Sequence, residues 1–132
     1  MLLDRAEPYI EQIARQIASF VVSGVLLPEE RLPSNDVAAK QIGVGKDTMV
    51  GVYKVLCDHG ISSSTPSGTF ITAQAERQAR RYLFSDRIGV LIHYGHTLDL
   101  DDDEMGGVFL ATLLRLEQRA GKTGTIPIDD AP

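Results

Sequence analysis

The sequence contains a single cysteine, Cys57, and it nowhere contains the run of about 20 apolar residues that crosses a bilayer. An internal disulfide is therefore excluded, and a reducing compartment such as the cytosol is expected. The first residues, MLLDRAEPY, reach an acid and a proline at once, so we expect no secretory leader and no membrane anchor. Cys57 lacks an evident base and is interpreted as a small apolar helix residue.

Sequence motifs of catalysis are also missing. The chain has no glycine-rich phosphate loop, no G-x-S-x-G nucleophile elbow and no H-E-x-x-H zinc motif. We therefore expect a protein that is not an enzyme and that needs no cofactor.

Basic residues are in the minority. The 132 residues include 13 Lys and Arg against 18 Asp and Glu, a formal net charge of −5. Both the part up to Thr72 and the part after it are acidic. Most nucleic-acid-binding domains are basic, so the charge alone argues against that function.

The apolar pattern predicts three helices and a hairpin up to Thr72. The first helix covers residues 8–23, begins at Pro8 and stops at Gly24. Its apolar residues recur at steps of three and four, namely Ile10, Ile13, Ile17, Phe20 and Val21. This spacing predicts that all five face the core.

A helix-turn-helix follows. Ser34 is expected to cap a short helix over about residues 35–41, with Asp36 in its first turn. The tight turn IGVG leads to a helix over about residues 46–59, which Gly60 ends. Its expected inward residues are Met49, Val52, Tyr53 and Leu56. The runs ISSS and TFIT flank the turn-forming TPSG and predict a β-hairpin, so this part reads as a winged helix-turn-helix.

The pattern becomes helical again after the hairpin. One helix is expected from Ala75 to about Tyr94, and a second amphipathic helix follows the segment GHTLDLDDDE. Two such helices cannot bury both apolar faces against so small a core, so we expect a homodimer with two-fold symmetry. The residues expected in the dimer contact are Leu83, Phe84, Ile88, Leu91, Ile92, Val108, Phe109, Leu113 and Leu116.

The predicted fold class is therefore α+β and mostly helical. The predicted domains are a winged helix-turn-helix over residues 1–72 and a two-helix dimerisation segment over 73–120. Residues 121–132 show no period and are expected to form a flexible tail.

Residues 8–72 resemble the DNA-binding domain of the GntR family of bacterial transcription regulators. The resemblance lies in ordered pieces, P-Y-x-x-I, S-G-x-L-x-P-x-x-x-L-P-S, A-A-x-x-G-V and G-T-F. The short remainder is similar to the YtrA subfamily, in which two C-terminal helices mediate dimerisation. The resemblance implies a cytoplasmic homodimer, in most cases a repressor, that binds a palindromic operator in double-stranded DNA. The third helix would enter the major groove and the wing a neighbouring minor groove.

The basic residues usual at this surface in the family are scarce here. Val50 and Gly51 stand where the third helix often carries arginine, and the wing has serine, threonine and proline in place of arginine or lysine. The residues that remain for DNA contact are Ser34, Asn35, Lys46, Asp47, Thr48, Lys54, Ser67 and Gly68. Two or three cations per subunit predict a log–log salt slope of about −4 to −5 for the dimer.

Two alternatives stay open at this point. The scarcity of cations also fits a winged-helix dimer that has lost DNA binding and acts as a protein-interaction module.

Gly51 costs the third helix roughly 1 kcal/mol relative to alanine. One explanation is that the helix comes close to the DNA backbone or to another helix, which requires a glycine. The other is that the helix no longer contacts a partner, so its sequence has changed without constraint.

Two further kinds of site, one for a metal ion and one for an effector, have candidate residues. His93 and His96 precede an acidic run that suggests a metal, but the calcium-loop template from Asp99 has Glu104 where glycine is needed. The run is interpreted as solvated, dipole-favoured residues before a helix. An unidentified small-molecule effector would need a cleft at the dimer interface, near Tyr82, Phe84, Tyr94 or His93, and simple packing also explains these residues.

Overall fold

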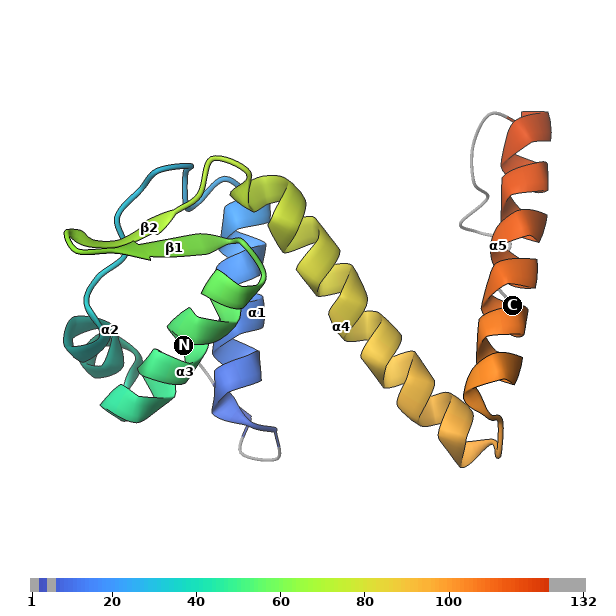
Figure 1. Cartoon of the computed structure of the whole chain (residues 1–132), viewed down its shortest axis with the longest axis horizontal. Coiled ribbons are helices and arrows are strands. Elements are labelled where there is room, and N and C mark those ends of the chain that lie inside the picture. The colour runs from blue at the N-terminus through green and yellow to red at the C-terminus, as the bar shows by residue number, and fades with distance from the viewer. Residues whose placement is uncertain (1–2, 5–6, 124–132) are drawn as a thin grey trace. The chain divides into compact units, whose positions relative to one another are not determined.

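The computed structural model describes residues 3–4 and 7–123, and its internal contacts divide the chain into two units, Met1–Arg87 and Ile88–Pro132. The elements in chain order are α1 (Tyr9–Val22), α2 (Asn35–Ile42), α3 (Lys46–Asp58), β1 (Ser62–Thr65), β2 (Gly68–Ile71), α4 (Ala75–Thr97) and α5 (Asp102–Thr123) (Figure 1). The predicted class, mostly helical α+β with a winged helix-turn-helix, is confirmed. Helix α4 begins in the first unit and ends in the second.

Helix α1 is the central helix of the first unit. Pro8 stands at its N-cap, and its buried residues are Gln12, Ile13, Ala14, Ile17, Ala18 and Val21. The prediction that Phe20 faces the core is wrong, because its side chain is 40% exposed. The buried face of α1 includes the small residues Ala14 and Ala18 beside Ile13 and Ile17. Phe20 lies at the edge of this face.

The helix-turn-helix forms within one residue of the predicted bounds. The Ser34 side chain accepts a hydrogen bond from the Val37 amide at 3.3 Å and so caps α2. Gly43 ends α2 at φ +88°, a left-handed conformation that favours glycine. Helix α3 buries Met49, Val52 and Leu56 completely. Tyr53, the fourth residue expected to face inward, is partly buried.

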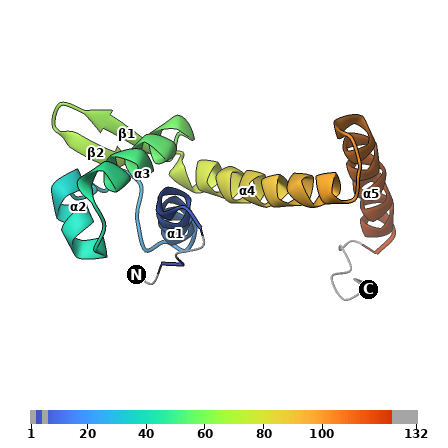
Figure 2. The ribbon, with the colours of Figure 1, turned by 90° about the horizontal axis from the view of Figure 1, so that it is seen from below.

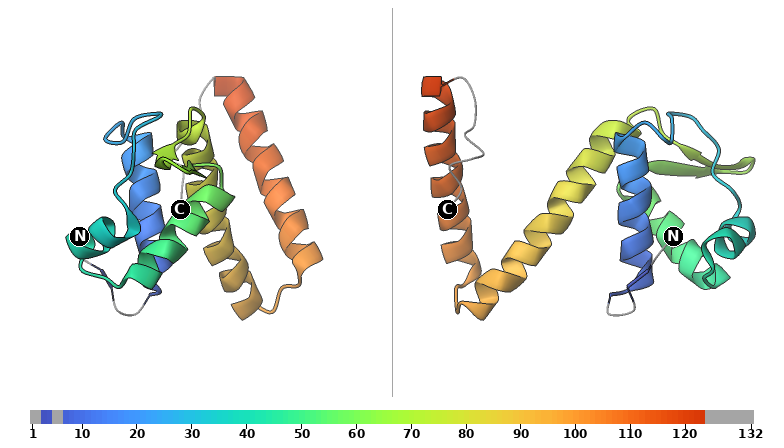
Figure 3. Two further views of the ribbon diagram at one scale, coloured as in Figure 1. Left: turned by 60° about the vertical axis from the view of Figure 1, so that its left-hand side comes forward. Right: turned by 180° about the vertical axis from the view of Figure 1, so that it is seen from behind.

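Gly51 lies where α3 comes close to α1. A Cβ atom added at Gly51 would stand 2.6 Å from Cδ1 and 3.2 Å from Cγ1 of Ile10. The views agree that the two helices lie side by side (Figures 1 and 3). Of the two reasons considered for this glycine, close approach to another helix is the one with a visible cause.

The wing is an antiparallel hairpin in which Ser62 pairs with Ile71 and Thr65 with Gly68. The segment before α2 runs along the other edge of β2. The Glu29 amide donates to Ile71 O at 2.7 Å, the Ile71 amide donates to Glu30 O at 2.8 Å, and the Leu32 amide donates to Thr69 O at 2.8 Å. Arg31 therefore stands opposite Phe70 in an antiparallel bridge, and the wing has a third, short strand-like edge.

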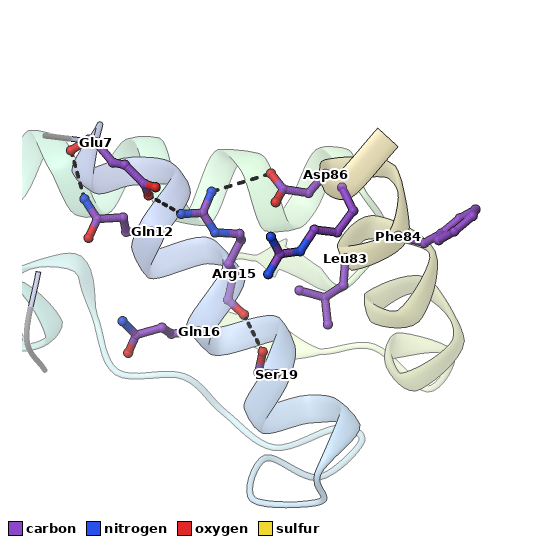
Figure 4. Close-up of a pocket in the computed structure, with 9 residues that line it drawn as sticks. Glu7, Gln12, Arg15, Gln16, Ser19, Leu83, Phe84 and Asp86 are labelled. Atoms are coloured by element: carbon purple, nitrogen blue, oxygen red, sulfur yellow. Dashed lines mark hydrogen bonds and ion pairs between the residues drawn. The ribbon is translucent and has the colours of Figure 1, made fainter. Parts of the chain in front are cut away.

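The first part of α4 closes the core of the first unit. Ala75, Ala79 and Tyr82 are buried with residues of α1 and α3. Arg15 of α1 lies between Glu7 and Asp86, and its Nη1 atom is 3.5 Å from Asp86 Oδ1 (Figure 4). This ion pair ties α1 to α4 at the end of the first unit.

The second unit consists of the end of α4 and of α5. Met105 of α5 packs against Gly95, and its sulfur fills the space that a side chain at position 95 would take. His96 Nε2 lies 3.1 Å from Asp102 Oδ1 across the same corner. Helix α5 continues through Thr123, three residues into the segment expected to be a tail, and residues 124–132 lie outside the described part. None of the described helices has the length and apolar character that would let it cross a membrane.

The contact between Gly51 and Ile10 yields a stability prediction. Gly51→Ala should raise the free energy of unfolding of the wild type by well under the roughly 1 kcal/mol of helix propensity, because the end of the partly buried Ile10 side chain must move aside for the new Cβ atom. In an Ile10→Ala background, which removes all three contacting atoms, the same change should raise it by the full amount. Denaturant unfolding followed by circular dichroism, at one protein concentration, measures the four proteins. Equal effects of Gly51→Ala in both backgrounds would show that the close approach does not require the glycine.

Candidate nucleic-acid interface

Four pieces of the first unit make up the surface that we call the candidate interface. They are Arg31, the N-terminal residues Ser34–Asp36 at α2, the exposed side of α3 and the wing turn over residues 65–68. A cleft of about 210 Å³ joins three of them, since it is lined by Arg31, Leu32, Pro33, Ser34, Asn35, Tyr53, Gly68 and Thr69. The wing turn projects to the same side as α2 in views from front and back (Figures 1 and 3).

The burial of one side of α3 leaves a polar stripe on the other. Lys46, Asp47, Val50 and Lys54 are exposed along three turns, while Thr48 is half-buried. Gly45 at the N-cap offers no side chain, so no side chain caps the first amides of α3. These amides and the positive end of the helix dipole are available to an anion. In Figure 2 α3 lies between α2 and the hairpin.

Both lysines of this stripe have a carboxylate partner within the chain. Lys46 Nζ lies 3.6 Å from Asp36 Oδ1, and both side chains are more than 60% exposed. Lys54 Nζ donates to Asp58 Oδ2 at 2.9 Å, and this hydrogen bond raises the pKa of Lys54. Exposed pairs of this kind are weak and exchange readily with other anions. The pairing nevertheless cancels much of the positive charge on the exposed side of α3.

The hydroxyl groups of the wing turn are used within the turn. Thr65 Oγ1 donates to Gly68 O at 3.0 Å and lies 3.1 Å from Ser67 Oγ. Because Thr65 has one hydroxyl proton, the Ser67 hydroxyl is the donor in the second bond. Ser67, a predicted contact residue, therefore has its proton engaged. Gly68 holds φ +137°, which favours glycine.

Arg31 is the residue that sequence reasoning missed. A Cβ atom at Gly68 would lie 2.9 Å from Nε and 3.3 Å from Cζ of Arg31, so the guanidinium lies against the glycine. Among the described residues, no carboxylate forms an ion pair with Arg31. The signal was present, since Arg31 directly precedes the L-P-S piece of the resemblance. Its position beside the wing depends on backbone pairing that the local pattern does not reveal.

Asn35 and Tyr53 meet in the cleft beside Arg31. Asn35 Oδ1 is buried and has no hydrogen-bond partner among the described residues. The Tyr53 hydroxyl donates to the Pro33 carbonyl at 2.6 Å and links α3 to the segment before α2. Burial raises the pKa of Tyr53, so the phenol stays protonated as a donor near neutral pH.

The expected dimer residues divide by environment. Leu83 packs partly against the core of the first unit, and Ile88 and Leu116 are half-buried. The others, all at least 42% exposed, are Phe84, Leu91, Ile92, Val108, Phe109 and Leu113. Val90, Leu110 and Leu114 are exposed as well and were not predicted. The second unit thus carries far more exposed apolar surface than an isolated chain normally leaves in water.

Two further kinds of site, one for a metal ion and one for a small molecule, bear on function. In the described part of the chain, no three His, Cys, Asp or Glu residues are arranged to hold a metal ion. A cleft of about 540 Å³ between α1 and α4 is lined by Glu7, Gln12, Arg15, Gln16, Ser19, Leu83, Phe84, Asp86 and Arg87 (Figure 4). Its central Arg15 is paired with carboxylates on both sides. We assign no ligand to it.

Several solved structures share this fold. A GntR family transcriptional regulator from Listeria monocytogenes superposes with a TM-score of 0.59 at 18% identity, covering 83% of this chain and 98% of its own. YtrA from Sulfolobus acidocaldarius, a GntR-family transcription factor, superposes with a TM-score of 0.53 at 22% identity. The match covers 89% of this chain and 99% of YtrA. BusR from S. agalactiae, in complex with its busAB-promotor DNA, superposes with a TM-score of 0.56 at 18% identity. The match covers 89% of this chain and 58% of BusR.

No family model matches the sequence. At these identities the likeness establishes that the fold is shared, and a shared fold does not imply a shared function.

The hydrogen bond of Tyr53 yields a second stability prediction. Tyr53→Phe should lower the free energy of unfolding by about 1 kcal/mol, because the Pro33 carbonyl loses its donor. Tyr9→Phe is the matched control, since Tyr9 is also half-buried in the first unit and its hydroxyl has no hydrogen-bond partner among the described residues. Denaturant unfolding measures both variants. An equal effect of the two changes would mean that the bond contributes nothing to stability.

Proposed function

We propose that this chain is a DNA-binding transcription regulator of the GntR family with a YtrA-like C-terminal segment. In this proposal it acts in the cytoplasm of a bacterium as a homodimer, and it is not an enzyme. It represses by occupying a palindromic operator in double-stranded DNA that overlaps a promoter. The exposed side of α3 enters the major groove, and the wing approaches a neighbouring minor groove.

The observation that carries the proposal is the composition of the candidate interface. The uncapped N-terminus of α3, Lys46 and Arg31 together offer donors and positive charge on one side of the first unit. Phosphate contacts of this kind fix a protein on the duplex, and exposed polar residues of a groove-lying helix read the bases. Asp47 can accept a hydrogen bond from a cytosine amino group, and Thr48 can contact a base or a phosphate.

The second candidate function is a winged-helix dimer that binds another protein and no DNA. The pairing of Lys46 with Asp36 and of Lys54 with Asp58 favours it, because it removes charge that DNA binding uses. The two functions separate in one experiment. Selection from a random-sequence duplex library should enrich a two-fold symmetric site for a regulator, and it should enrich nothing above background for an interaction module.

The ion pair between Lys46 and Asp36 gives opposite predictions for its two partners. On the selected duplex, Lys46→Ala should weaken binding and make the salt slope shallower by about 2 for the dimer, because one phosphate contact per subunit is lost. Asp36→Asn should tighten binding and steepen the slope, because it frees Lys46 and removes a repulsive charge.

Binding isotherms from fluorescence anisotropy at several salt concentrations measure both changes. Glu11→Gln is the charge-matched control for Asp36→Asn, since Glu11 lies on α1 near Tyr82 and not at the candidate interface. Weaker binding of Asp36→Asn than of the control would mean that Asp36 assists DNA binding.

The exposed apolar side chains of the second unit give a prediction on assembly. Leu113→Glu should convert the dimer to a monomer, because a charge in an apolar contact must be desolvated without a partner. Sedimentation velocity measures the mass. The control is Val25→Glu, a comparably exposed apolar residue of the first unit. A wild-type protein that sediments as a monomer, or a Leu113→Glu variant that stays dimeric, would contradict the proposed interface.

A further inference from the structure

The wing of this chain contains no cation of its own. From Ser62 to Ile71 its residues are SSSTPSGTFI, without lysine or arginine. The hydroxyl protons of Thr65 and Ser67 are engaged within the turn. A wing of this composition cannot hold a phosphate group by charge.

Arg31 is built into the wing by the backbone. The hydrogen bonds that join Glu29 and Glu30 to Ile71, and Leu32 to Thr69, flank Arg31 on both sides. They place it opposite Phe70 as a residue of the outer edge of the hairpin. Although Arg31 precedes the wing by more than thirty residues, its side chain belongs to the wing in space.

Gly68 provides the surface on which the guanidinium lies. Any side chain at position 68 would place its Cβ atom 2.9 Å from Nε and 3.2 Å from Nη2 of Arg31. The absence of a side chain therefore does more than permit φ +137° at this residue. It lets the guanidinium of Arg31, a planar cation with several N–H donors, lie against the base of the wing turn, next to the cleft that contains Asn35.

We propose that Arg31 supplies the phosphate contact that the wing otherwise lacks, with the Asn35 amide as a second donor in the same cleft. This inference rests on the proposed function, since its ligand is a phosphate of the DNA backbone. Arginine binds phosphate oxygens through two parallel N–H donors. Because Oδ1 is the buried end of the Asn35 amide, its NH₂ group is the end that can donate to the same phosphate.

The test uses the duplex selected by the wild-type protein. Arg31→Ala should weaken binding roughly 10- to 60-fold at 0.1 M salt and make the salt slope shallower by about 2, the loss of one phosphate contact per subunit. Arg31→Gln, which keeps a polar side chain of similar length, should do the same. Phosphate ethylation interference should lose one position per half-site while the positions that depend on Lys46 remain.

A charge-relocation variant separates this role from a structural one. In the Arg31→Ala background, Ser67→Arg should restore most of the affinity and of the salt slope, because it returns a cation to the wing beside Gly68. Ser19→Arg is the matched control, since it adds the same charge at an exposed position of α1. It should restore little.

The outcomes distinguish the inference from the function beneath it. Suppose that Lys46→Ala weakens binding and that Arg31→Ala and Arg31→Gln do not. The proposed phosphate contact of Arg31 is then wrong, while the proposed DNA-binding function is kept. Equal rescue by Ser67→Arg and Ser19→Arg also overturns the inference, since net charge would then explain the effect. If the wild-type protein binds no duplex, the inference and the proposed function fall together.

Discussion

The burial of Met49, Val52 and Leu56 against α1 holds the helix-turn-helix in place within the first unit. It fixes the rotation of α3 about its own axis and so decides that Lys46, Asp47, Val50 and Lys54 remain in water. Gly51 allows this packing to be close, with Ile10 occupying the space of the missing side chain. Gly51, which weakens α3 as a helix, is therefore the residue at which Ile10 of α1 packs against α3. The same packing leaves the first amides of α3 without a cap at the end that carries Lys46.

Within the described residues, the candidate interface contains two lysines in weak surface ion pairs and one arginine, Arg31, that forms no ion pair. The two lysines of α3 are paired at the surface, where ion pairs contribute little and are screened by salt. Arg31 has no such partner in the described structure and lies on Gly68 at the wing. An acidic protein can therefore still present a locally attractive surface to a duplex. The affinity of the proposed DNA contact would depend on salt and on the few groups that stay available.

Local sequence signals predicted most of the fold, and contacts between distant segments account for what they missed. Helix caps and turn residues such as Ser34, Gly43 and Gly60 are read from neighbouring residues, and the corresponding elements begin and end where expected. Phe20 was placed in the core because periodicity cannot tell how small residues such as Ala14 and Ala18 let another helix approach. Arg31 was missed for a related reason. Arg31 lies beside the wing because it pairs with Phe70 of β2. The two residues are far apart in the sequence, and local patterns do not reveal such a pairing.

A titration of the labelled protein with the selected duplex, followed amide by amide by NMR, shows directly which surface of the first unit contacts DNA. We expect the largest chemical-shift changes at the N-terminus of α3, at Arg31 and at Gly68, with few changes in the buried part of α1. Changes confined to α5, or no changes at all below the concentration at which any polyanion binds, would contradict the proposed DNA contact.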